Sequence, residues 1–247
     1  MKAYILTLEN NHGRAADLTN YPKAFPKPEL FYGVEPETCE VPKWWLDHYK
    51  NAFKLDKPER VYCCGKSKEL LLRKHKELFP NEDLLLMEDD VMFSDDANER
   101  YDKFIADVPN NWKLLYLGGY HEDTCRGCTP LEVKPGLLRI FKTVGNEAVI
   151  IRASVLDDAI DLLTASPDNL FGHSDWQLVE IQKKNCCYAP LGFIAGQQNG
   201  WSHLFQKDRV IGFRNDFFYE GYDRKVHAYG NPSKACTCSC CKHNSSK

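Results

Sequence analysis

The sequence contains no long hydrophobic run. Its purely apolar stretches are only a few residues long, whereas a membrane-spanning helix needs about 20 apolar residues in succession. The N-terminal stretch MKAYILTLENNHGR also has too short an apolar segment for a signal peptide. We therefore expect no transmembrane segment and a cytoplasmic location.

The sequence also lacks a strong excess of charge of either sign. Lys and Arg number 32 and Asp and Glu number 35, which gives a formal net charge of −3. Proteins that bind nucleic acids or anionic membranes through their overall charge are usually much more basic than this. We therefore expect no nucleic-acid partner.

No internal repeat is present, and one biased segment stands out at the C-terminal end. The chain has 247 residues, of which 43% are hydrophobic and 27% charged. This balance suits a globular domain that buries its core without disulfide support. We expect one domain over residues 1–231 and a cysteine-rich tail over residues 232–247, whose composition predicts a disordered end.

Cysteine is plentiful, with 11 residues, but the pattern does not define a disulfide framework or a metal site. An odd number of cysteines without a signal peptide favours reduced thiols in a cytosolic setting. Cys125 and Cys128 have the spacing of half a zinc site, but no clear second pair lies nearby in the sequence.

Apolar strand patterns alternate with amphipathic helix patterns through most of the chain. Strands are expected at residues 2–8, 82–87, 112–119, 147–152, 186–190 and 193–198. Helices are expected at residues 66–79, 97–108, 154–163, with Ser154 as N-cap, and 174–184. This alternation predicts an α/β fold with a mainly parallel central sheet.

Three acidic residues follow one of these buried strands directly, in LLLMEDDVMF (84–93). Ligands bind at the carboxyl ends of strands in open α/β sheets. If the extended conformation continues, Glu88 and Asp90 point to the same side, because strand side chains alternate. Two carboxylates suit Mn²⁺ or Mg²⁺, which also coordinates substrate phosphates. A solvated acidic turn is the alternative.

Several stretches, in this order, resemble glycosyltransferase family 25, which includes bacterial lipooligosaccharide and collagen galactosyltransferases. They are YILTLENNHGR (4–14), CCGKSKELL (63–71), LLLMEDDVMF (84–93), WKLLYLGG (112–119), EAVIIRASVLDDAIDLL (147–163) and HSDWQL (173–178). Two departures matter: the family's Ser-His is Ser67-Lys68 here, and its Arg-rich turn is reduced to ENNHGR. The family's galactose specificity is therefore not carried over.

The resemblance implies the GT-A fold, a Rossmann-like nucleotide-sugar-binding type. It also implies a metal-dependent enzyme that moves a sugar from a nucleotide-diphosphate sugar to a hydroxyl of a glycan or glycoprotein, and a UDP-sugar is the expected donor. The cation, Mn²⁺ or Mg²⁺, would bridge the diphosphate and the protein ligands Asp90, Glu88 and the late His203. A surface or packing role is the alternative for His203.

Other residues are expected around the nucleotide. Thr7 and Leu8 end the first strand and should line the nucleotide pocket, and Asp89 lies between the two acidic metal ligands. Arg14 suits a phosphate or the base. Lys66 and Ser67 begin the predicted helix, where they could bind a phosphate or the ribose. Solvated side chains are the alternative for Arg14 and for this helix start.

Asp175 is the predicted catalytic base. Ser174 and Gln177 fit a capping box, which places Asp175 in the first turn of a helix, where the helix dipole favours an ionised carboxylate. An inverting sugar transfer needs a carboxylate to accept the proton of the acceptor hydroxyl. An ordinary N-terminal Asp is the alternative, and Glu122 and Asp123 are the reserve candidates.

Two other functions fit parts of the sequence. A sugar nucleotidyltransferase shares the α/β fold and an acidic metal site, but it would want a glycine-rich loop after the first strand, and ENNHGR is a poor one. A catalytically inactive carbohydrate- or protein-binding module would not need the intact acidic cluster.

Overall fold

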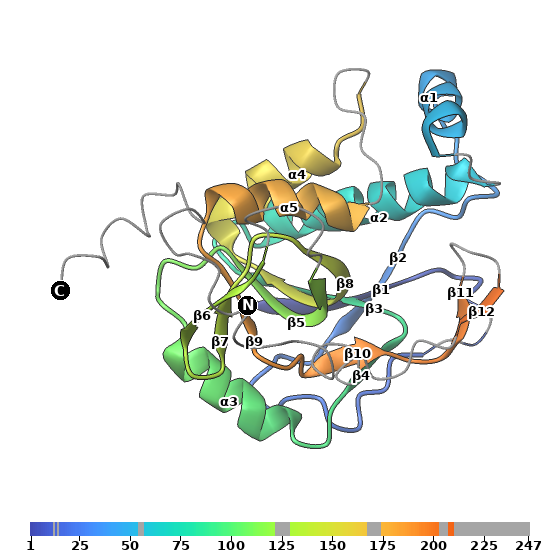
Figure 1. The fold of residues 1–247 in the computed structure, drawn as a ribbon. Coiled ribbons are helices and arrows are strands. Elements are labelled where there is room, and N and C mark those ends of the chain that lie inside the picture. The colour runs from blue at the N-terminus through green and yellow to red at the C-terminus, as the bar shows by residue number, and fades with distance from the viewer. Residues whose placement is uncertain are drawn as a thin grey trace.

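The computed structural model describes residues 1–11, 13, 15–53, 57–121, 129–166, 174–202 and 207–209. These residues form a central sheet with helices on both faces (Figure 1). None of the helices in the described ranges is long and apolar enough to cross a membrane.

The central sheet has eight strands in the order β2-β1-β3-β8-β5-β9-β7-β6. In this order the strands are Glu29–Tyr32, Lys2–Thr7, Leu84–Glu88, Thr143–Ile151, Leu114–His121, Cys187–Pro190, Leu137–Arg139 and Leu131–Lys134. All of these strands run in one direction except β8 and β7. The predicted α/β class is confirmed, and the sheet is mainly parallel in direction, with the antiparallel β8 between β3 and β5.

Five helices and two small sheets complete the described structure. The helices are α1 (Lys43–Phe53), α2 (Pro58–Leu78), α3 (Ala97–Asp107), α4 (Leu156–Leu163) and α5 (Ser174–Lys184). β4 (Val91–Phe93) pairs with β10 (Ala195–Gln197), and β11 (Gly200–Ser202) pairs with β12 (Lys207–Arg209).

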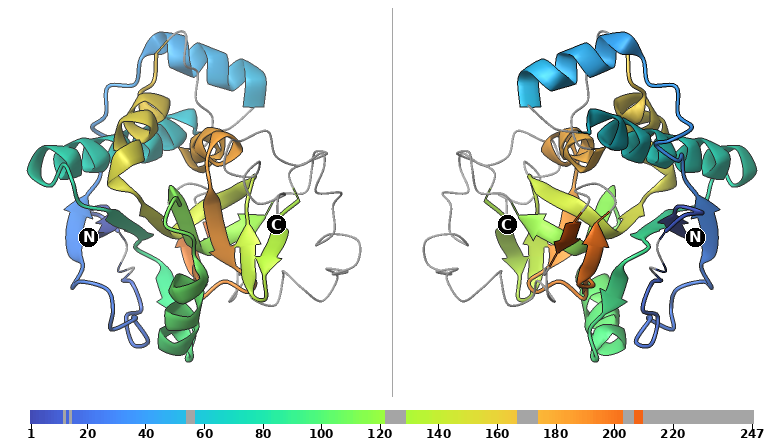
Figure 2. Two further views of the ribbon diagram at one scale, coloured as in Figure 1. Left: turned by 90° about the vertical axis from the view of Figure 1, so that its left-hand side faces the viewer. Right: turned by 90° about the vertical axis from the view of Figure 1, so that its right-hand side faces the viewer.

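Alternation along the central strands divides the core into two layers. In β3, Leu84 and Leu86 pack in the cluster that contains α2, α4 and α5, whereas Leu85 and Met87 pack in the cluster that contains α3. The views in Figure 2 show these helices on opposite faces of the sheet. Because both faces are covered, β3 is apolar throughout its length until it reaches Glu88.

A third, smaller cluster holds α1 against the start of α2. Trp45 stacks on Tyr49 with ring centroids 4.3 Å apart, and Tyr62 of α2 meets Trp45 edge-on. The sequence patterns did not predict α1.

Several predicted element boundaries are corrected. α2 begins at Pro58, well before residue 66, because proline is favoured in the first turn of a helix. α4 begins at Leu156 after a 3-10 turn, and Ser154 does not cap it, since its hydroxyl accepts a hydrogen bond from Lys113 Nζ at 2.8 Å. β8 begins at Thr143, earlier than predicted. α5 occupies residues 174–184 as predicted.

The cysteines are not all reduced. In the described part of the chain, Cys186 is disulfide-bonded, whereas the others are thiols: Cys39, Cys63, Cys64 and Cys187. The expectation of reduced thiols is therefore wrong for Cys186. Cys125, Cys128 and the tail at 232–247 lie outside the described residues.

Candidate functional site

The carboxyl ends of β1 and β3 meet at a point where the strand order reverses. The chain passes from β1 to β2 on one side and later forms β3 on the other side of β1. Such a point is where ligands bind in open α/β sheets. Here the buried Thr7 Oγ1 donates a hydrogen bond to the buried Asp89 Oδ2 at 2.8 Å. The two strand ends that the sequence analysis assigned to the nucleotide are therefore in direct contact.

The three acidic residues of EDDV do not share one backbone conformation. β3 ends at Glu88, and Asp89 and Asp90 form a turn before β4. The condition that the extended conformation continues through Asp90 is therefore not met, and the inference that Glu88 and Asp90 point to the same side does not hold. Strand side chains alternate between the two faces of a sheet, so Glu88 lies on the same face as Leu84 and Leu86, which is the face covered by α2.

A buried lysine on α2 pairs with Glu88. Lys68 Nζ lies 3.0 Å from Glu88 Oε1, and the Lys68 side chain is only 4% exposed. Lys68 Nζ also donates to the side-chain oxygen of Asn146 at 2.9 Å when that amide is oriented to satisfy both of its neighbours. Burial alone would lower the pKa of Lys68, but the nearby acidic groups Cys64, Glu88 and Asp175 raise it above its usual value. Lys68 is therefore a cation at neutral pH.

A bulge in β8 directs two polar side chains towards this cluster. The register between β5 and β8 shifts on both sides of Gly118, and residues 145–147 bulge out between the partners of Gly118 and Tyr120. Gly145 has φ +82°, in the left-handed region, and Asn146 and Glu147 are buried. Bulges commonly re-aim side chains in this way beside functional sites.

Asp175 lies in the first turn of α5, as predicted, and the bulge holds it in place. Gly145 N donates to Asp175 Oδ2 at 3.0 Å. Asp175 lies near enough to two buried tyrosines to affect their ionisation: burial first, and then the charge of Asp175, raises the pKa of Tyr49 and of Tyr116. Asp175 and Lys68 therefore belong to one polar cluster, which spans α2, β8 and α5.

The late strand β10 passes close to β5 and brings a glutamine to the acids. A Cβ on Gly118 would lie 2.8 Å from the Ala195 carbonyl oxygen, so this approach requires the glycine of YLGG. Gln197 Nε2 donates to Asp90 Oδ2, and Gln198 N donates to the Asp90 carbonyl oxygen at 2.7 Å. The late segment thus reaches the acidic turn.

Several predicted residues lie outside the described residues. They are Arg14, His203 and the reserve acids Glu122 and Asp123. Leu8 follows directly after β1, and its carbonyl oxygen lies 3.4 Å from Thr7 Oγ1.

Lys66 and Ser67 do not begin a helix, and that part of the prediction is wrong. Both lie inside α2, where Lys66 Nζ pairs with Glu69 Oε2 at 2.8 Å. Ser67 Oγ donates to the Cys63 carbonyl oxygen at 2.6 Å and accepts from Val34 N at 2.8 Å. The Ser67 hydroxyl thus attaches the loop after β2 to α2.

Three residues of the cluster were not assigned a role from sequence: Lys68, Asn146 and Glu147. For the last two a signal exists, because a Gly-Asn pair inside the apolar run TVGNEAVII indicates a bulge. For Lys68 the signal is its position, where the resembling family has histidine.

The acidic side chains at the end of β3 can bind a divalent cation only together with further ligands. Within the described ranges, no group of three or more His, Cys, Asp or Glu side chains is placed to hold a metal ion. Asp89 and Asp90 offer adjacent carboxylates, and Mg²⁺ commonly takes one or two carboxylates together with phosphate oxygens. These two residues therefore fit a cation that arrives with a diphosphate. Glu88 fits less well, because Lys68 already balances its charge.

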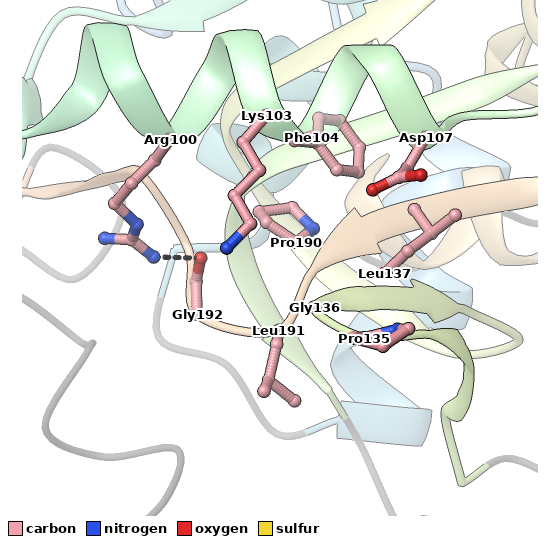
Figure 3. A pocket seen from close by; sticks show the side chains of 10 residues that line it. All are labelled: Arg100, Lys103, Phe104, Asp107, Pro135, Gly136, Leu137, Pro190, Leu191 and Gly192. Atoms are coloured by element: carbon pink, nitrogen blue, oxygen red, sulfur yellow. Dashed lines mark hydrogen bonds between the residues drawn. The ribbon is translucent and has the colours of Figure 1, made fainter.

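A cavity of about 160 Å³ lies elsewhere in the molecule, and Figure 3 shows the residues around it. α3, the β6–β7 turn and the loop before β10 form its walls, and Arg100 donates to the Gly192 carbonyl oxygen at its side. None of the predicted site residues lines it.

Comparisons with known proteins assign no family. No protein-family model matches the chain, and no curated protein matches it. Among solved structures, it is similar to A197 from STIV, with 14% identity, a TM-score of 0.36 and coverage of 76% of this chain and 81% of that chain. It is also similar to a glycosyltransferase involved in the glycosylation of the major capsid of PBCV-1, with 14% identity, a TM-score of 0.35 and coverage of 73% and 76%. These values are too low to assign an activity to this chain.

Proposed function

We propose that this protein is a metal-dependent glycosyltransferase that uses a nucleotide-diphosphate sugar. One observation carries the proposal. The six separate stretches that resemble the glycosyltransferase family all reach the same end of the sheet, where the parallel strands β1, β3 and β5 end and β8 begins. Their contributions are Thr7, Lys68, the acids Glu88 to Asp90, Gly118, the bulge residue Glu147 and Asp175.

In this proposal the donor binds at the carboxyl ends of β1 and β3. Asp89 and Asp90 would hold Mn²⁺ or Mg²⁺, while Glu88 remains with Lys68. When bound, the cation supplies positive charge that stabilises the departing nucleotide diphosphate. Thr7 fixes the Asp89 carboxylate, so one ligand is oriented before the donor arrives. A UDP-sugar donor and His203 as a further ligand are part of this proposal.

Asp175 is the general base for a glycan or glycoprotein hydroxyl. The Gly145 N–H group fixes one of its oxygens, which leaves the other to accept the hydroxyl proton. In a single displacement, the hydroxyl oxygen forms a bond to the anomeric carbon as the bond from that carbon to the diphosphate breaks. The configuration at the anomeric carbon is therefore inverted.

The test is release of nucleoside diphosphate from a panel of nucleotide sugars, with glycan acceptors and Mn²⁺. Wild type is compared with Asp90→Asn and with Asp157→Asn, which removes the charge of a surface carboxylate on α4 that pairs with Lys76. We expect release by wild type and Asp157→Asn, and its loss in Asp90→Asn. Folded wild-type protein that turns over none of the donors would contradict the proposal.

A further inference from the structure

Lys68 connects three elements of the cluster through one ammonium group. It projects from α2, contacts Glu88 Oε1 at 3.0 Å at the end of β3, and contacts the Asn146 side-chain oxygen at 2.9 Å in the bulge of β8. The Lys68 side chain is 4% exposed and that of Glu88 is 28% exposed, so the ammonium is buried and its ion pair with Glu88 is partly so.

Stability alone does not account for a lysine at this position. A buried ion pair is often no more stabilising than apolar side chains of the same volume, because both charges must leave water. The neighbouring residues of α2, Leu71 and Leu72, are fully buried and apolar, so the helix could present an apolar residue here too.

The bulge transmits the position of Lys68 to Asp175. Asn146 is joined directly to Gly145, whose N–H group holds Asp175 Oδ2 at 3.0 Å. The charge of Asp175 also helps to raise the pKa of Lys68, in keeping with this arrangement. A change in the ammonium therefore acts on the carboxylate through the backbone of the bulge.

We propose that Lys68 is a positioning residue for the base Asp175, acting through Asn146 and the bulge of β8. This inference rests on the proposed glycosyl transfer. Lys68 need not touch the donor, because Glu88 and Asn146 engage its ammonium on the protein side. Its loss should therefore lower kcat and leave the donor KM nearly unchanged.

The test compares three variants of the full chain. Lys68→Met keeps the length of the side chain and removes the charge, and Lys68→Arg keeps the charge. Lys76→Met is the control, because Lys76 lies on the same helix but pairs with Asp157 at the surface. Each variant is assayed for kcat, for donor KM and for Tm.

We expect Lys68→Met to lose about 10²-fold in kcat, the size of effect that a small misplacement of a catalytic group produces. Its donor KM should stay within about threefold, a change far smaller than that loss. Lys68→Arg should recover part of the lost kcat, and Lys76→Met should match wild type. If Lys68→Met does not fold, Asn146→Ala cuts the connection to the bulge and keeps the Lys68–Glu88 pair, with the same pattern expected.

The outcomes separate the two proposals. If wild type and Lys76→Met transfer sugar and Lys68→Met, or its substitute Asn146→Ala, has the same kcat, the role of Lys68 is refuted and the transferase remains. If the loss in Lys68→Met appears in donor KM rather than in kcat, Lys68 acts on the donor and the positioning role is wrong. If wild type transfers no sugar, both proposals fail.

Discussion

Replacing Gly145 by alanine perturbs the β8 bulge without changing any charge. Gly145 has φ +82°, a conformation that costs an L residue about 1–2 kcal/mol. The new Cβ would lie 2.5 Å from Glu147 Oε2, so that carboxylate must move. Because the Gly145 N–H group also holds Asp175 Oδ2 at 3.0 Å, the proposed base moves with the bulge.

Gly136→Ala is a matched control for the backbone strain. Gly136 has φ +85°, but a Cβ there would have no atom within 4 Å. It lies in the turn between β6 and β7, which the polar cluster does not include. Both variants should therefore lose about 1–2 kcal/mol of unfolding free energy, while only Gly145→Ala should displace the site.

The assay pairs urea unfolding with kcat at saturating donor. We expect Gly145→Ala to lose about 10²-fold in kcat, as for a base displaced by a fraction of an ångström to 1 Å, and Gly136→Ala to remain close to wild type. Equal kcat in the two variants, at equal loss of stability, would refute the view that the bulge positions Asp175.

Three further predictions follow from the same geometry. Asp175→Asn should lower kcat by about 10²–10⁴-fold with little change in donor KM, and NMR of the wild-type product should show inversion; retention would exclude the single displacement. EDTA should abolish transfer and Mn²⁺ should restore it, so full activity in EDTA would show that Asp89 and Asp90 hold no essential cation. Burial lowers the pKa of His75 in the folded state. As the pH falls below about 6.5, His75 is therefore protonated in the unfolded state before it is protonated in the folded state. The free energy of unfolding should then fall by up to about 1.4 kcal/mol per pH unit. Urea unfolding at pH 7, 6 and 5 should show a smaller slope for His75→Gln than for wild type. Part of the slope remains, because burial lowers the pKa of His121 to about 3. An unchanged slope would contradict the role of His75.

Sequence patterns predicted the parts of the fold that depend on local periodicity. The apolar run before Glu88 predicted β3, because a strand covered on both faces is apolar at every position. The helix pattern of α5 predicted both its limits and the place of Asp175 in its first turn. Helix α1 was not predicted, because its stability comes from contacts with α2, such as that between Trp45 and Tyr62, rather than from helix propensity.

The least predictable part of the candidate site is the part that long-range contacts create. Gly145 and Asn146 interrupt the strand pattern, so the first half of β8 was missed along with the bulge it contains. Glu88 and Lys68 are 20 residues apart in the sequence, and no local period connects them. The sequence could show that the three acids needed positive charge nearby, but only the fold shows that Lys68 supplies part of it.

Nucleotide-diphosphate binding at the ends of β1 and β3 is tested most directly by thermal shift. Wild type and Asp90→Asn are heated with a panel of nucleotide sugars, each with and without Mn²⁺. A donor at 100 times its Kd stabilises the folded state by about 2.7 kcal/mol, which raises Tm by several degrees in a chain of this size, about 2–4 °C per kcal/mol. We expect such a rise for wild type with at least one nucleotide sugar and Mn²⁺, and none for Asp90→Asn. No rise with any donor, or an equal rise in both proteins, would contradict the proposed site.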